Sequence, residues 1–173
     1  AVLQDGYIFS DTIANNIAAS DSVTNMAKVQ VAAKLAKVEE YVEQLPMRYN
    51  TVIGMEGHGL SAGQKQRILI ARAIYKNAPY MFLDEATNAL DANNESEIMG
   101  NLKECFVGKT VLVIAHRLST VRDADKIVVM NQGEIVEVGT HDSLIAQNGY
   151  YYKLINNQMQ TTNICSQKSK TQK

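Results

Sequence analysis

The residues of this chain best suited to chemistry begin with a predicted helix start. Ser61 and Gln64 have the spacing of a capping box and precede an amphipathic run, so they predict the first turn of a helix. Ala62 and Gly63 lie in that turn. Their small side chains leave backbone N–H groups uncovered at the positive end of the helix dipole, which suits a phosphate.

A pair of acids follows at the end of a short apolar segment. Residues 80–83 predict a buried strand, and Asp84 and Glu85 come directly after it. Two adjacent carboxylates are costly in an apolar core unless a cation or hydrogen bonds compensate their charge. One segment therefore combines a helix start suited to an anion with a strand end suited to a cation.

The order and spacing of these motifs resemble those of the ATP-binding cassette (ABC) ATPases. LSAGQ at 60–64, the acids at 84–85 and NALD at 88–91 are similar to the signature motif, Walker B motif and D-loop of that family. The similarity extends from Gln4 to about Leu154. It implies an α/β fold, namely a partial P-loop NTPase (RecA-like) core with an inserted helical subdomain.

The resemblance also implies a catalytic set. Asp84 would order the shell of a Mg²⁺ ion, Glu85 would act as general base on the attacking water, and His116 would contact the γ-phosphate. Gln4 opens a segment that resembles the Q-loop of ABC exporters, and it would reach both the metal and the water. Catalysis by such a set rests on positioning and electrostatics.

Cassettes of this family meet head to tail, which implies a shared site. Ser61 and the Gly63 backbone, with Ala62 and Gln64, would face ATP held by a second cassette, identical or different, and Asp91 would line the interface. The implied cofactors are ATP and Mg²⁺. The implied partners are that second cassette and the transmembrane domain of the same transporter, with no nucleic acid.

Ala62 stands where the family most often has glycine, LSAGQ in place of LSGGQ. A positive φ at an alanine would cost about 1 kcal/mol or more. We therefore predict an ordinary negative φ at Ala62, and we expect Gly63 to be the position that does not tolerate a side chain.

The resemblance divides the chain into four segments. They are the end of a core strand with the Q-loop (1–11), a helical subdomain with the signature motif (12–78), the C-terminal half of the ATPase core (79–159) and a polar tail expected to be disordered (160–173).

Local patterns predict further elements in these segments. A helical period over 23–45 predicts one buried stripe made of Val31, Leu35, Val38 and Val42. Downstream, we predict a helix over 94–106, a strand over 110–115 that leads into His116, a hairpin with its turn at 131–133, and a helix capped by Thr140.

Gly108, Lys109 and Thr110 look like the end of a phosphate-binding P-loop, G-x-x-x-x-G-K-[ST]. The first glycine of that motif would have to be residue 103, which is Lys103, and Thr110 begins a β-branched run that predicts a strand and not a helix. The 173 residues contain no other match, and the chain starts in what reads as a strand already under way. We expect a fragment that does not hydrolyse ATP by itself.

Composition limits the class of protein. Hydrophobic residues make up 46% of the 173 and the net charge is -1, so a globular core is expected and a broadly basic, nucleic-acid-binding surface is not. Two distant cysteines give no disulfide framework, which fits a reducing compartment. No apolar run approaches a membrane span. With the resemblance, this places the chain at the cytoplasmic face of the plasma (inner) membrane, as part of a membrane protein.

Three functions stay open on the sequence. The first is part of the ATPase domain of an ABC exporter, most similar to bacterial peptidase-containing or bacteriocin-type exporters that move peptides. The second is a soluble ABC ATPase that acts on DNA or the ribosome, against which the exporter-like Q-loop argues. The third is a non-catalytic module that only dimerises, against which Glu85 and His116 argue.

Overall fold

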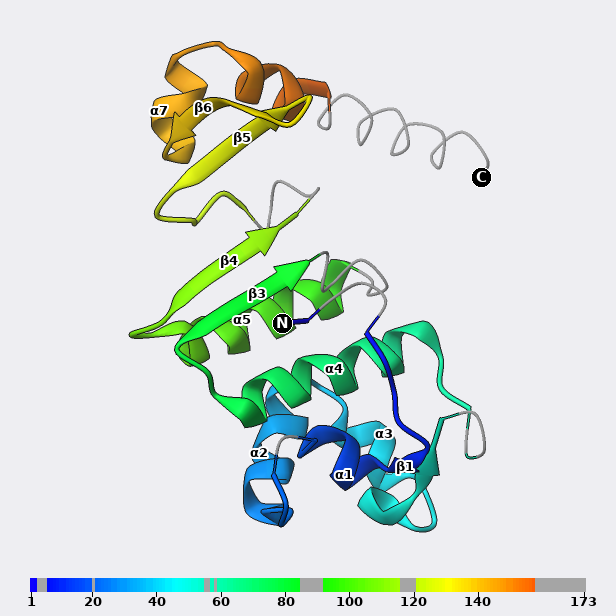
Figure 1. Cartoon of the computed structure of the whole chain (residues 1–173). Coiled ribbons are helices and arrows are strands. Elements are labelled where there is room, and N and C mark those ends of the chain that lie inside the picture. Colours follow the sequence, from blue (N-terminus) through cyan, green and yellow to red (C-terminus); the bar gives the residue numbers. More distant parts are fainter. Residues whose placement is uncertain are drawn as a thin grey trace, which may run out of the picture. The chain divides into compact units, whose positions relative to one another are not determined.

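The computed structural model (Figure 1) describes residues 1–2, 6–19, 21–54, 57, 59–84, 92–115 and 121–157, with the backbone alone at 92–96. The chain forms two compact units, Ala1–Ile114 and Ala115–Lys173. In its described residues, no helix has both the length and the apolar character that crossing a membrane requires.

The first unit contains most of the helices in the described part of the chain. Its elements are β1 (Asp11–Thr12), α1 (Ile13–Ile17), α2 (Met26–Leu35), α3 (Glu39–Glu43), a 3-10 turn (Arg48–Asn50), β2 (Val52–Ile53), α4 (Ala62–Lys76), β3 (Tyr80–Asp84), α5 (Ala92–Phe106) and β4 (Thr110–Ile114). Residues from α1, α2, α4, β3 and α5 share one hydrophobic core. The predicted helix at 94–106 and strand at 110–115 are confirmed within two residues.

A small parallel sheet organises this unit. β3 and β4, the neighbouring green arrows of Figure 1, run in the same direction with Asp84 opposite Ile114. On the other edge of β3, Val2 forms a parallel bridge with Leu83. Parallel strands joined through a helix, here α5, are the arrangement that the predicted α/β class requires.

Strand β3 is buried on one face only. Met81 and Leu83 are buried, whereas Tyr80 and Phe82 on the opposite face are exposed. The predicted strand at 80–83 is confirmed, and its predicted burial holds for Met81 and Leu83 only. An uninterrupted apolar run does not reveal that neighbouring side chains point to opposite faces.

The prediction of a single helix over 23–45 is wrong. The chain breaks between α2 and α3, where Lys37 has a left-handed φ of 55°. The predicted stripe assumed one continuous period. The break changes the phase, so that Val31 is 59% exposed while Val29, Ala32 and Ala33 form the buried face of α2. Val38 and Val42 of the predicted stripe are fully buried, as predicted.

The second unit is a hairpin followed by helices. β5 (Ile127–Asn131) and β6 (Glu134–Gly139) pair antiparallel, and residues 132 and 133 both have positive φ, as a type I′ turn requires. Thr140 caps α7 (His141–Ala146), and residues 150–157 form a further helical segment. The predicted hairpin and cap are confirmed. The Glu137 carboxylate accepts hydrogen bonds from the backbone N–H groups of Tyr150 and Tyr151 at 2.5 and 2.9 Å and so caps that segment.

Two tyrosines of the first unit have equal burial but unequal hydroxyl environments. Tyr49 is 5% exposed and its hydroxyl has no partner among the described residues. Tyr75 is 6% exposed, and its hydroxyl donates to Asp21 Oδ2 at 2.7 Å and accepts from the Asn25 N–H at 3.2 Å. A buried hydroxyl without a partner opposes folding, so we expect Tyr49→Phe to stabilise the chain by about 1 kcal/mol. Tyr75→Phe is the matched control and should lower the urea midpoint.

Tyr49 should also make the stability of the folded chain depend on pH. Burial, with the charges of Glu39 and Glu43, raises the pKa of Tyr49 from its ordinary 10.0 to about 12. The folded chain holds the phenol proton to a higher pH than the unfolded chain does. The free energy of unfolding therefore keeps its full value with respect to this group below pH 10, and it falls as the pH rises from 10 to 12. Tyr49→Phe should remove this part of the alkaline decline in urea midpoint. A decline that is identical in the two proteins would contradict the assignment.

Candidate functional site

The start of α4 forms the capping box that the sequence predicts. Ser61 Oγ accepts a hydrogen bond from the Gln64 N–H at 3.2 Å, and the Ser61 N–H donates to Gln64 Oε1 at 2.8 Å. Ala62 lies inside the helix and is absent from the residues with positive φ, which confirms its predicted backbone conformation. Ser61 and Ala62 are exposed. The helix start is thus preformed and open to solvent.

Two N–H groups at this helix start remain available. The Gln64 N–H is satisfied by Ser61 Oγ, and the Lys65 N–H by Ser61 O at 2.9 Å. The N–H groups of Ala62 and Gly63 have no acceptor in the described part of the chain. They lie at the positive end of a 15-residue helix. This arrangement suits an anionic group such as a phosphate.

The acidic end of the candidate site lies at the carboxyl end of β3. The Asp84 N–H donates to Val2 O at 2.9 Å, which fixes the backbone there. The Asp84 side chain is partly buried and has no hydrogen bond or ion pair with other described residues. A carboxylate in this state can ligate Mg²⁺, which prefers oxygen ligands and usually keeps several of its waters.

The parallel register brings three chain segments to the same edge of the sheet. Val2 lies beside Leu83, and Ile114 lies opposite Asp84. Gln4 follows Val2 by two residues, Glu85 follows Asp84, and His116 follows Ile114 by two. The carboxyl ends of parallel strands are where open α/β sheets bind ligands. Among the described residues, Val2, Asp84 and Ile114 thus end at one edge of the sheet.

Only part of the predicted site falls in the described residues. Ser61, Ala62, Gly63, Gln64 and Asp84 are described, whereas Gln4, Glu85, Asp91 and His116 lie outside the described residues. Within the described ranges, no hydrogen bond or ion pair joins the α4 start to Asp84, and no three His, Cys, Asp or Glu side chains are grouped as a metal site would need. The predicted roles therefore stay predictions.

The P-loop-like tripeptide has a structural role. Thr110 begins β4, as predicted, and no helix starts there. Lys109 Nζ donates to Asn77 Oδ1 at 2.5 Å. Asn77 is the left-handed residue that ends α4. Lys109 therefore ties the end of α4 to the start of β4.

A half-buried arginine links α4 to the segment that follows Gln4. Arg72 Nε donates to Asn16 O at 2.7 Å, Nη1 donates to Tyr7 O at 2.9 Å, and Nη2 donates to Asn16 Oδ1 at 3.2 Å. The guanidinium lies over the Phe9 ring, 5.2 Å from its centre. Burial lowers the pKa of Arg72. Asn16 is fully buried, and its side chain bonds both the N–H and the carbonyl of Phe9.

Sequence reasoning missed Arg72 and Asn16. The available signal was a charged residue inside the apolar run from Ile70 to Ile74. Because buried charges need partners, such a residue indicates a polar network. The network fixes the backbone of the loop relative to α4, and so relates the chain after Gln4 to the helix that begins at Ser61.

The chain is similar to known proteins along nearly all of its length. Residues 3–88 match the family model described as "ABC transporter". An "ATP-dependent lipid A-core flippase" of Pseudomonas savastanoi pv. phaseolicola is 51% identical over 154 residues, which cover 88% of this chain and 26% of that protein. The protein of the same name from Syntrophus aciditrophicus is 49% identical over 153 residues, with the same coverage. The chain therefore spans about a quarter of the length of these relatives.

A solved structure has the same fold. It is described as a "bacterial Atm1-family ABC exporter with ATP bound", and it superimposes with a TM-score of 0.85 at 41% sequence identity. The match covers 91% of this chain and 27% of that one. The predicted P-loop NTPase type of fold is thereby confirmed.

Proposed function

We propose, from the premise that this chain belongs to the ABC transporter family, that it is the C-terminal part of the nucleotide-binding domain of an exporter. The complete protein would couple ATP hydrolysis to transport across a membrane. The observation that carries this proposal is the parallel register of Val2, β3 and β4, which end at one edge of the sheet, because open α/β sheets bind their ligands at the carboxyl ends of parallel strands.

The proposed chemistry divides between the two carboxylates and their neighbours. Asp84 would hold Mg²⁺, which neutralises phosphate charge when it is bound. Glu85 would accept the proton of the attacking water, and Gln4 would orient that water. His116 would donate a hydrogen bond to the γ-phosphate as charge develops on it.

The α4 start would serve a different nucleotide. The open N–H groups of Ala62 and Gly63 and the Ser61 hydroxyl would face ATP held by a second cassette, and Asp91 would line the interface between the cassettes. Support comes from the exposure and the preformed cap of this helix start. A transmembrane domain of the same protein would be the other partner, and the chain would then lie at the cytoplasmic face of the plasma (inner) membrane.

The comparisons give no support to a peptide cargo. The relatives reported above are lipid flippases and an Atm1-family exporter, so the resemblance to bacteriocin-type peptide exporters is not supported. We favour a lipid-like amphiphile over a peptide, on 51% identity to a flippase cassette. ATPase stimulation of the reconstituted full-length protein by lipid A-core, measured against a leader peptide, separates the two cargo classes. None of these comparisons favours a soluble ABC ATPase or a module that only dimerises.

The chain by itself is expected to be inactive. Its 173 residues contain no G-x-x-x-x-G-K-[ST] loop, which supplies most phosphate contacts in nucleotide sites of this type. We expect no Mg²⁺-dependent phosphate release by the purified chain above that of its Glu85→Gln variant. Turnover that survives purification and is abolished by Glu85→Gln would contradict this expectation.

A further inference from the structure

The α2–α3 turn, taken here as the last residue of α2 and the three that follow it (35–38), has an unusual backbone. Lys37 has φ 55°, a conformation that residues with side chains rarely adopt. Its flanking residues Ala36 and Val38 are fully buried in the same core as Ile98 and Leu102 of α5. A strained conformation persists where its surroundings determine it, so the contacts of this turn indicate what it does.

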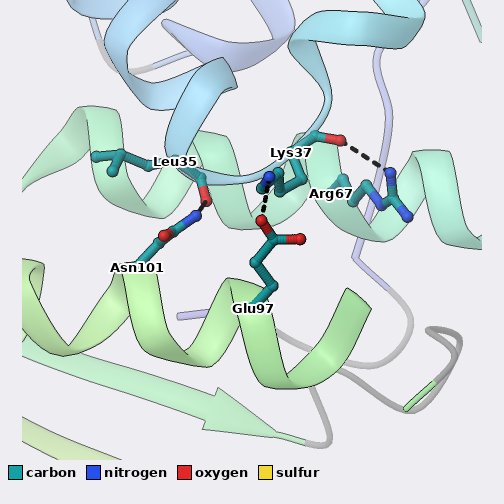
Figure 2. A network of polar contacts seen from close by, with 5 residues as sticks. All are labelled: Leu35, Lys37, Arg67, Glu97 and Asn101. Atoms are coloured by element: carbon teal, nitrogen blue, oxygen red, sulfur yellow. Dashed lines mark hydrogen bonds and ion pairs between the residues drawn. The ribbon is translucent and has the colours of Figure 1, made fainter. Parts of the chain in front are cut away.

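Two carbonyl groups of the turn are bound by two different helices (Figure 2). Asn101 Nδ2 of α5 donates to Leu35 O at 3.0 Å, and Arg67 Nη1 of α4 donates to Lys37 O at 2.8 Å. Carbonyls at a helix end have no partner within their own helix and need one from elsewhere. Here the partners are side chains that are 66 and 30 residues away in the sequence. The turn therefore joins α4 to α5.

The Lys37 side chain adds a weaker contact. Its ammonium pairs with the Glu97 carboxylate of α5. The Glu97 side chain is 55% exposed, so water and salt screen this pair and it contributes little. In contrast, Arg67 Nε is buried without a partner among the described residues, which means that the guanidinium gives up hydration to make its bond to the turn. The backbone carbonyls, and not the ion pair, define the geometry.

The position of the turn relates it to the site. Arg67 lies three residues after Gln64, one helical turn beyond the capping box, and α5 begins directly after Asp91. We propose that the α2–α3 turn is a clamp that holds the start of α4 at a fixed position relative to α5, with Arg67 and Asn101 as positioning residues. This inference rests on the proposed function, in which the α4 start and Asp91 meet the second cassette.

The test compares three variants in the full-length protein. Arg67→Met and Asn101→Leu each remove one donor to the turn. Lys37→Gly removes the ion pair but keeps both carbonyls, and glycine adopts the left-handed φ without strain. The first measurement is backbone hydrogen exchange in residues 62–70. We expect faster exchange in Arg67→Met and Asn101→Leu, and wild-type exchange in Lys37→Gly.

The second measurement is the KM for ATP. We expect Arg67→Met to raise KM about fivefold while kcat changes less than about twofold, because a misplaced α4 start weakens nucleotide binding and leaves the strand-end residues in place. Arg67→Lys keeps a cationic donor and should restore part of the affinity. Wild-type exchange in both donor variants overturns the clamp, as does equally fast exchange in Lys37→Gly. Faster exchange with an unchanged KM overturns the positioning role. If the wild-type protein hydrolyses no ATP, the proposed function fails, and the exchange measurement decides on the clamp.

Discussion

Glu85→Gln in the full-length protein is expected to lower the rate of ATP hydrolysis by about 10²–10⁴-fold, the range that a positioned general base contributes. Glutamine keeps the size and the hydrogen-bonding shape of the side chain but cannot accept the proton of the attacking water. ATP binding needs no proton transfer. The variant should therefore retain ATP, which can be measured as labelled nucleotide that stays with the protein after rapid gel filtration.

Glu134→Gln is the matched control, because Glu134 is an exposed residue of the β5–β6 hairpin in the second unit. It makes the same chemical change at a residue outside the predicted catalytic and binding set and should leave turnover unaltered. Wild-type turnover in Glu85→Gln would refute the role of this residue as general base. Loss of both turnover and ATP binding would instead indicate that Glu85 is needed to form the site.

Arg72→Met is expected to have the largest effect on stability, a loss of about 3 kcal/mol, because hydrogen bonds to a charged group each contribute about 1.5–3 kcal/mol. The substitution removes three donors and leaves the carbonyls of Asn16 and Tyr7 without them. Methionine fills similar space but cannot replace a planar donor fork, and lysine should restore only part of the stability. The measurement is urea unfolding of the chain.

The matched control for Arg72→Met is Lys76→Met, one turn further along α4, where the side chain is exposed. It should change the free energy of unfolding by less than about 0.5 kcal/mol. Equal urea midpoints for Arg72→Met and the wild type would show that the network around Asn16 does not hold the loop. The loop and α4 would then have to be fixed by apolar packing alone.

The sequence correctly predicted the caps and turns that depend on residues a few positions apart. The Ser61 and Gln64 capping box, the turn at Gln132 and Gly133 and the Thr140 cap each depend on residues within a few positions, so the sequence indicated them correctly. Local sequence patterns could not predict the parallel pairing of β3 with β4, since it joins strands that are 30 residues apart. The family resemblance implied it, and the register confirms that this part of the fold is α/β.

Long-range polar contacts were missed for the same reason. Arg72 bonds Asn16 across 56 residues and Tyr7 across 65, and nothing near Asn16 in the sequence indicates that it is buried. The break at Lys37 was also missed, because no glycine or proline marks it and its left-handed conformation is held by Arg67 and Asn101 from other helices. Tertiary contacts override the local helical pattern there.

We propose that this chain is part of an ATP-hydrolysing cassette of a membrane exporter. The most direct test is the rate of Mg²⁺-dependent phosphate release by the full-length protein in lipid vesicles, measured for the wild type and for Ser61→Arg, whose larger side chain would occupy the open α4 start. We expect turnover that stops when Mg²⁺ is chelated and that is strongly reduced in Ser61→Arg. Absence of Mg²⁺-dependent turnover in the wild type, or equal turnover in the two proteins, would contradict it.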